Sequence, residues 1–378
     1  MTRHIDHIVF GKPPVHGELR IAAIGATGRI GARVVELIES RSREWSTLGL
    51  QPRVVFAANS RASAVDLDGL TLTSLATRLH EAAIWPDFVD LGIDVVLDCT
   101  ASAEIAALYP EWLACGIHVV TPNKIASSSD YTQQTTILGA QARSGAQLRD
   151  ATTVGAQLPL LSTLTELRRA GDRLERLQAV LSGTLSYVLG NLQAGESLSQ
   201  SIGEAVSLGY AEPNPACDLS GIDAARKLVI LLRAAGVDIE LGDVERIPLL
   251  DVADGPWIDA AIAVDETWRA RAALAQARHE KWIYRASYEH GRARIAPERV
   301  PLDHPLARLA PCENALVLHS ELYRDAPLTI AGPGAGIALT AAGVFADLLA
   351  VAERYVTPRV LVQAAVPRAG VGAAVLAR

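Results

Sequence analysis

The chain has 378 residues, of which 49% are hydrophobic and 20% charged, with a formal net charge of −7. This length exceeds one compact core, so we expect two globular domains, and the acidic balance without a basic stripe argues against nucleic acid as a partner. The sequence has no signal-peptide core, no apolar run long enough for a membrane span, and four cysteines without disulfide or metal spacing, so we expect a cytoplasmic protein with no membrane partner.

The first 150 residues alternate short apolar strands with helical segments, which indicates a parallel sheet covered by helices on both faces. The predicted strands cover residues 19–25, 53–60, 93–100 and 117–123. The predicted helices cover residues 28–40, 102–116 and 130–143.

The segment "IAAIGATGRIGARVV" has the pattern of a strand, a glycine turn and a helix. Its glycines stand where a dinucleotide fold needs a tight turn, a bare backbone and close helix packing. The helix start then offers N–H groups to a pyrophosphate. A purely structural turn is the alternative, but the position near the start of an α/β half favours a dinucleotide. We predict a Rossmann-type doubly wound parallel sheet in residues 1–150, with cofactor contacts from Gly25, Thr27, Gly28, Arg29 and Ile30.

The end of the second predicted strand, "AANSRAS", bears on the choice of cofactor. An acidic residue there would hold the ribose 2′-hydroxyl of NAD, whereas an arginine suits the 2′-phosphate of NADP. The strand ends with Asn59, Ser60 and Arg61, and no acid. We therefore predict NADP, with NAD as a second cofactor. A solvated surface role for Arg61 is the alternative.

After residue 151 the pattern changes to a second, α+β arrangement. A helix precedes a strand at 175–183 and a helix at 184–195, and a longer helical region runs from about 197 to 236. The segment 281–300 is typical of a hairpin that turns near "HG", and 313–322 and 326–332 are further strands. We predict a substrate domain over 151–330, a helix over 331–355 returning to the nucleotide domain, and a loosely held tail over 356–378.

The segment "DLSGIDAARKLVILL" places Asp223 and Lys227 four residues apart, on one face of a helix. The chain has only four lysines against thirty-one arginines, and only a lysine can give up its proton in catalysis. An ordinary surface ion pair is the alternative. It is weakened because Ile230 and Ala234 extend the same face. Asp218, just before the helix, could be a helix cap.

Four segments carry a resemblance to a known family: "VVLDCTASAEIAALYPEWLACGIHVVTPNKIASS", "LSGTLSYVLG", "LGYAEPNPACDLSGIDAARKLVIL" and "GPGAGIALTAAGVFADLL". In this order, over residues 19 to 355, they resemble the homoserine dehydrogenases, and most closely the dehydrogenase half of bifunctional aspartokinase–homoserine dehydrogenases. The resemblance implies NAD(P)-dependent interconversion of L-homoserine and L-aspartate 4-semialdehyde in threonine and methionine biosynthesis. It also implies a homodimer formed through the substrate domain. With no aspartokinase before the dehydrogenase part, we expect a monofunctional enzyme.

The resemblance also implies roles for single residues. It makes Lys227, Lys124 and Asp223 catalytic. It gives cofactor contacts to Thr100, Lys124 and Gly336, and substrate contacts to Gly183, Thr184, Tyr210, Glu212, Asp218 and Asp223. Relatives hold a monovalent cation such as sodium through main-chain carbonyls of one loop, and Val154 and Ala156 occupy the matching positions. Gln157 and Ala151 depart from the family pattern in that loop.

Two alternatives to this function stay open. Another semialdehyde or imine reductase would fit "GATGRIG" alone, but the segment "DLSGIDAARK" argues against it. A non-catalytic NADP-binding sensor is the other, and the joint presence of Lys124, Glu212, Asp223 and Lys227 argues against that. His118 lies inside an apolar strand, and we predict a hydrogen-bonded core histidine rather than an acid–base residue.

Overall fold

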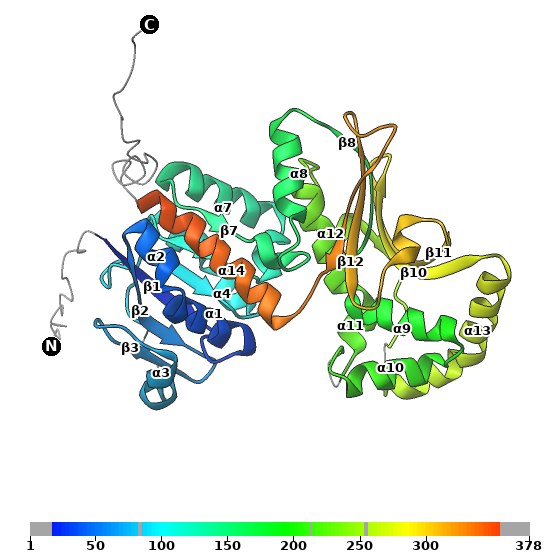
Figure 1. Ribbon diagram of the computed structural model, residues 1–378, viewed down its shortest axis with the longest axis horizontal. Coiled ribbons are helices and arrows are strands. Elements are labelled where there is room, and N and C mark those ends of the chain that lie inside the picture. Colours follow the sequence, from blue (N-terminus) through cyan, green and yellow to red (C-terminus); the bar gives the residue numbers. More distant parts are fainter. Residues whose placement is uncertain (1–16, 82–84, 212–213, 253–255, 356–378) are drawn as a thin grey trace, which may run out of the picture.

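The computed structural model describes residues 17–81, 85–211, 214–252 and 256–355. These residues form two units, each built around one sheet (Figure 1). Glu212 and the predicted tail 356–378 lie outside the described residues. None of the helices in the described ranges combines the length and the apolar character that crossing a membrane requires.

The first sheet has the strand order β4-β3-β2-β1-β5-β6-β7. Its strands are β1 (Glu18–Ile24), β2 (Gln51–Ala58), β3 (Ala62–Val65), β4 (His80–Glu81), β5 (Val95–Asp98), β6 (His118–Val120) and β7 (Leu148–Arg149). From β2 to β7 neighbouring strands run parallel, whereas β3 and β4 pair antiparallel at one edge. The Rossmann-type prediction is confirmed. The short strands β3 and β4 were not predicted, because neither offers a sustained apolar run.

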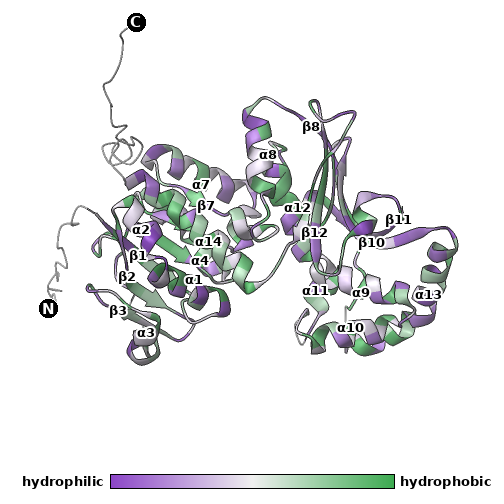
Figure 2. Ribbon diagram, viewed as in Figure 1, coloured by the Kyte–Doolittle hydropathy of each residue, from purple (hydrophilic) through white to green (hydrophobic). Residues whose placement is uncertain are grey.

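Helices cover both faces of this sheet. They are α1 (Arg29–Ser40), α2 (Ser42–Leu48), α3 (Leu72–Arg78), α4 (Ala103–Ala107), α5 (Tyr109–Ala114), α6 (Lys124–Ser127) and α7 (Tyr131–Ser144). Alternate residues of β1 enter different cores, with Leu19 and Ile21 on the α1 side and Ala22 and Ile24 on the α5 side. In Figure 2 the strands β1 and β2 are accordingly hydrophobic. The predicted helix 102–116 is divided in two, since Pro110 stands in the first turn of α5.

The second sheet has the order β13-β12-β8-β10-β11-β9. Its strands are β8 (Leu174–Val180), β9 (Val244–Arg246), β10 (Glu280–Glu289), β11 (Arg292–Pro301), β12 (Glu313–Ser320) and β13 (Leu328–Pro333). The predicted hairpin is confirmed: β10 and β11 pair antiparallel through a turn in which His290 and Gly291 have φ of 51° and 75°. One face of this sheet forms the largest apolar core with the helices of the unit.

The helices of the second unit differ from the prediction in number and length. They are α8 (Leu160–Arg169), α9 (Gly183–Ala194), α10 (Leu198–Ser207), α11 (Ala216–Ser220), α12 (Ile222–Ala234) and α13 (Trp257–Ala277), and short 3-10 turns occur at η1 (Ala151–Thr153), η2 (Leu241–Asp243) and η3 (Pro305–Arg308). The region from 197 to 236 is three helices, broken by Gly209 and Gly221 with φ of 72° and 74°. Helix α13 was missed because few of its side chains are buried, so its apolar stripe is weak.

The last helix, α14 (Ile337–Ala352), followed by η4 (Glu353–Tyr355), packs beside α1 in the core of the first unit. Phe345 of α14 meets Trp45 edge to face at 5.7 Å between ring centroids. The chain thus passes between the units twice, after β7 and again between β13 and α14. Both crossings border the cleft described next.

Candidate active site

The glycine turn after β1 is shaped by close backbone contacts. Gly25 has φ of 75° and its N–H donates to the carbonyl of Ala58 at 2.8 Å. A Cβ on Gly31 would lie 2.1 Å from the carbonyl oxygen of Gly25, so only glycine allows α1 to begin there. Gly28 is the N-cap of α1 and offers no side chain to the first turn. The amide groups at this helix start therefore suit a pyrophosphate, which is what a dinucleotide requires.

The end of β2 is tied to the glycine turn by Asn59. Its side-chain nitrogen donates to Thr27 Oγ1 at 3.1 Å, and its side-chain oxygen accepts the N–H groups of Arg61 and Ala62, both at 2.9 Å. This turn holds the backbone of Arg61 near the cofactor turn, with the residue exposed to solvent. Arg29, at the start of α1, is also exposed.

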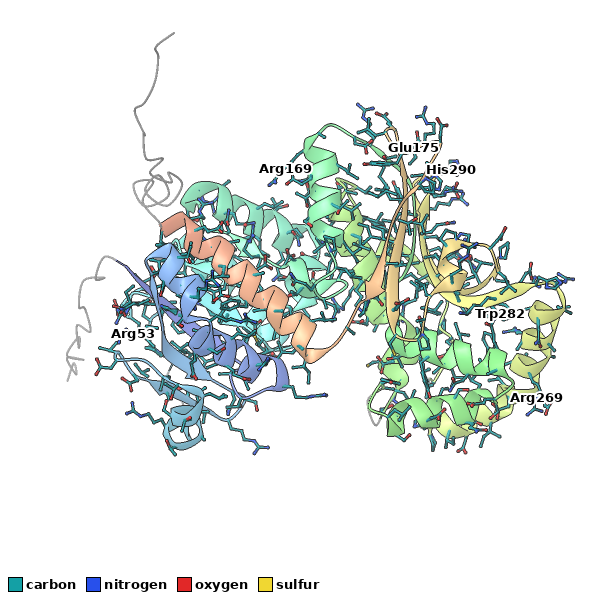
Figure 3. All side chains as sticks on the ribbon, in the orientation of Figure 1. Arg53, Arg169, Glu175, Arg269, Trp282 and His290 are labelled. Carbon is teal, nitrogen blue, oxygen red and sulfur yellow. The ribbon has the colours of Figure 1, made fainter. Side chains whose placement is uncertain are left out.

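A cleft of about 440 Å³ lies between the two units. Its walls include predicted residues from both: Ile30, Thr100, Lys124, Ala156, Asp223, Lys227 and Gly336. Other hollows lie elsewhere, including one lined by Arg53 and one lined by Glu175 and His290. Figure 3 labels these three residues, which lie near the start of β2 and at one end of the second sheet. The predicted catalytic residues therefore share the cleft that also receives the start of α1.

Asp223 joins the two lysines of the cleft. Its Oδ2 lies 2.8 Å from Lys227 Nζ and its Oδ1 lies 3.2 Å from Lys124 Nζ. Burial by itself would raise the pKa of Asp223, but the charges of Lys227 and Lys124 outweigh burial and hold this pKa below its usual range. The carboxylate is therefore ionised at neutral pH and fixes both ammonium groups. Lys227 Nζ also donates to the carbonyl of Leu181 at 2.7 Å.

The start of α12 is placed by a glycine. Gly221 has φ of 74° and is at once the C-cap of α11 and the N-cap of α12. A Cβ there would lie 1.9 Å from the hydroxyl of Tyr284, which itself donates to the carbonyl of Ile247 at 2.8 Å. The glycine in "LSGID" therefore sets the position at which Asp223 enters the cleft.

The described lining of the cleft carries more basic than acidic side chains. Among the described residues, the charged side chains that line it are Lys124, Lys227, Arg226 and Asp223. Arg226 was not predicted; its Nη1 donates to Ser128 Oγ at 3.0 Å. Its place three residues after Asp223, on the same helical face, was the signal available in the sequence. The described lining is therefore positively charged, which suits anionic ligand groups.

Of the predicted substrate residues, Asp223 lines the cleft, whereas Gly183, Thr184, Tyr210 and Asp218 are not among its lining residues. Gly183 is the first residue of α9, and Ser182 is the N-cap of that helix. Two residues before Gly183, the carbonyl of Leu181 accepts the hydrogen bond from Lys227. Thr184 Oγ1 donates to the carbonyl of Tyr210 at 2.5 Å. Tyr210 itself is 46% exposed, and its ring lies 5.0 Å from that of Tyr187. Asp218 is half-buried in α11, and Glu212 lies outside the described residues.

The loop that resembles a cation site borders the cleft. Val154 is fully buried, and Ala156 has φ of 51° and lines the cleft. At Ala151, where the loop departs from the family pattern, the backbone N–H donates to Asp347 at 3.1 Å. The cation stays a prediction. Among the described residues no group of three or more His, Cys, Asp or Glu side chains could hold a metal ion.

His118 behaves as predicted. It is 6% exposed, and its Nδ1 accepts the N–H of Gln147 at 3.0 Å. Burial, with the charge of Arg354, lowers the pKa of His118 to about 4. A neutral, hydrogen-bonded core histidine is therefore confirmed.

Comparison with known proteins gives a consistent family. The homoserine dehydrogenase model matches residues 159–349, and the model of the homoserine dehydrogenase NAD-binding domain matches residues 27–149. A bifunctional aspartokinase/homoserine dehydrogenase of Haemophilus influenzae is 36% identical over 338 residues, which are 85% of this chain and 41% of that protein. The chain thus spans about two fifths of that relative.

Solved structures agree with this result. A protein of Archaeoglobus fulgidus that carries the provisional name homoserine dehydrogenase is 26% identical with a TM-score of 0.76, covering 90% of this chain and 100% of its own. A hyperthermophilic archaeal homoserine dehydrogenase in complex with NADPH shares the fold at 24% identity and a TM-score of 0.70, covering 89% of this chain and 98% of its own. The chain belongs to the homoserine dehydrogenase family.

Proposed function

We propose that the chain catalyses the NAD(P)-dependent interconversion of L-homoserine and L-aspartate 4-semialdehyde, a step of threonine and methionine biosynthesis. The observation that carries this proposal is the Lys124–Asp223–Lys227 cluster, which lies in one cleft with Ile30 of the cofactor turn. The cleft by itself would also suit other small aldehydes. The substrate class in this proposal therefore comes from family membership.

The proposed chemistry divides the work between cofactor and chain. When bound, the nicotinamide would supply the hydride chemistry at the carbon that carries the hydroxyl. The chain must move the hydroxyl proton and balance the charge that develops on oxygen. Lys227 is 14% exposed and lies against Asp223, so its amine is held in one place to take or give that proton. Oxidation of the alcohol releases a proton overall, so alkaline pH favours this direction.

We assign the remaining contacts by unit. The cofactor would be held by residues of the glycine turn, the end of β2 and the cleft wall: Gly25, Thr27, Gly28, Arg29, Ile30, Asn59, Arg61, Thr100, Lys124 and Gly336. The amino end of the substrate would be held by Tyr210 and Glu212. The turn at Gly183 and Thr184 would line the substrate pocket, with Asp218 and Asp223 as its acids. Arg61 supports a preference for NADP over NAD. The carbonyls of Val154 and Ala156 would hold the monovalent cation.

The division of the chain follows the same proposal. Residues 1–150 would bind the cofactor, 151–330 the substrate, and the helix in 331–355 would close the cleft from the cofactor side. We also propose a homodimer in the cytoplasm. On one face of the second sheet, Ile283, Val300 and Val317 pack on the short turn η3 rather than on a long helix, which supports that proposal. Light scattering that returned a strict monomer would refute the dimer.

The experiment is homoserine-dependent NADPH formation by the purified chain at alkaline pH. L-serine, one methylene shorter, is the control substrate, and we expect turnover only with L-homoserine. Tight NADPH binding without any turnover would instead support the non-catalytic sensor.

A further inference from the structure

Asp98, the last residue of β5, is a buried carboxylate that the proposed chemistry does not use. It is 0% exposed and lies at the carboxyl end of the strand that leads into the cleft wall at Thr100. Its Oδ1 accepts the N–H of Thr100 at 2.8 Å. Its Oδ2 accepts the side-chain amide of Asn123 at 3.1 Å and the hydroxyl of Tyr109.

The hydrogen bond from Asn123 connects Asp98 to the helix that begins with Lys124. The side-chain oxygen of Asn123 accepts the N–H of Ile125 at 3.0 Å and so caps α6, whose first residue is Lys124. Its side-chain nitrogen donates to both Asp98 and the carbonyl of Ser102, at 3.1 and 3.0 Å. Both donor positions of this amide and its oxygen are thus engaged, which fixes the point at which α6 begins with Lys124.

The third donor, Tyr109, holds the carboxylate from the core side. Burial raises the pKa of Tyr109 well above its usual range, and the charge of Asp98 raises it further, so the phenol remains a donor. Among the described residues Asp98 forms no ion pair, and its charge is balanced by neutral donors alone. Three donors that converge on two oxygens require a group that only accepts, which a carboxylate is and an amide is not.

We propose that Asp98 is a positioning residue that holds the Thr100 wall and the amine of Lys124 in a fixed relation to each other. The alternative is a purely structural role, in which Asp98 stabilises the core but does not fix Lys124 relative to Thr100. The link to catalysis rests on the proposed function, but the geometry of Lys124 can be measured without it.

The variants are Asp98→Asn and its matched control Tyr109→Phe. Asp98→Asn keeps the shape but turns an amide donor toward at least one existing donor. Tyr109→Phe removes the hydrogen bonds of the phenol to the same carboxylate and to Thr121, and it leaves the bonds from Thr100 and Asn123 to Asp98 in place. Asn123→Ser is a further variant, because serine can still cap α6 but is too short to reach Asp98.

The first readout is the acylation rate of single lysines by mass spectrometry. The chain has only Lys12, Lys124, Lys227 and Lys281, and Lys281 is the internal reference. We expect Lys124 in Asp98→Asn and Asn123→Ser to react about tenfold faster than in the wild type, because both variants lose the hydrogen bond between Asn123 and the Asp98 carboxylate. In Tyr109→Phe it should react at the wild-type rate. The reference Lys281 should not change.

The second readout is kinetic. Asp98→Asn should lower kcat by about tenfold or more with intact protein, and Tyr109→Phe should leave it within about twofold, even if both lower Tm. Wild-type Lys124 reactivity in folded Asp98→Asn would overturn the proposal. If Asp98→Asn does not fold, the acylation rate of Lys124 in Asn123→Ser is compared with the wild type instead, and an unchanged rate would overturn the proposal. A wild type inactive on homoserine would refute the proposed function alone, since the acylation result stands separately.

Discussion

Asp223 shows how one residue can organise a reaction site. Its carboxylate bridges Lys124 from the first unit and Lys227 from the second, at 3.2 and 2.8 Å. The side chain is 43% exposed, so the ion pairs are worth little as stabilisation. Their value lies in position: they hold two ammonium groups at one point of the cleft, beside Arg226.

Arg61 provides a prediction on cofactor choice at the same scale. In Arg61→Ala, kcat/KM with NADP should fall by about tenfold, because the charge-assisted contact to the 2′-phosphate is lost. The value with NAD serves as the internal control and should hardly change. Equal losses with both cofactors would show that Arg61 does not read the 2′-phosphate.

At the scale of elements, α14 and the loop after β7 are locked together. Gly343 touches the side chains of Thr152 and Gln157, and Asp347, one turn later, accepts the N–H of Ala151 and pairs with Arg149. The loop and the start of α14 both line the cleft. Their contact therefore fixes the cleft wall where the two units meet.

Gly343 and Gly190, both inside helices, make a matched pair. A Cβ on Gly343 would lie 2.3 Å from Thr152 Cγ2 and 2.4 Å from Gln157 Oε1, whereas at Gly190 nothing lies within 4 Å. We expect Gly343→Ala to lower the free energy of unfolding by about 1–3 kcal/mol through overpacking. Gly190→Ala should raise it by about 0.5–1 kcal/mol. Denaturant titration measures both, and equal effects would contradict the packing at Gly343.

Asp347 predicts a pH dependence. Burial, opposed by Arg149 and the Ala151 N–H and reinforced by Asp150, raises the pKa of Asp347 from 3.8 to about 6. The folded state therefore binds the proton more tightly than the unfolded state, so this contribution favours folding below the unfolded pKa and is lost as pH rises through the folded one. The unfolding free energy of the wild type relative to Asp347→Asn should thus fall by roughly 2–3 kcal/mol between about pH 4 and pH 7. A difference that stays constant or grows over this range would contradict it.

At the scale of the whole molecule, the sequence predicted elements with strong local signals. The glycine turn, the hairpin at His290 and Gly291, and the Asp223–Lys227 helix face all follow from short-range chemistry. The meeting of Lys124 with Asp223 came only from family resemblance, because the two lie on different units. Arg226 in the cleft wall and the Asp98 network depend on tertiary packing, which no local pattern encodes. Helix α13 was missed for the converse reason, since its apolar pattern is weak.

The most direct test of the central claim compares the wild type with Lys227→Arg. Arginine keeps the positive charge beside Asp223 but cannot release a proton at any working pH. We expect NADPH affinity to remain at the wild-type value and homoserine-dependent kcat to fall by about 10²–10⁴-fold. A Lys227→Arg enzyme that oxidises homoserine at the wild-type rate would contradict the role given to this lysine.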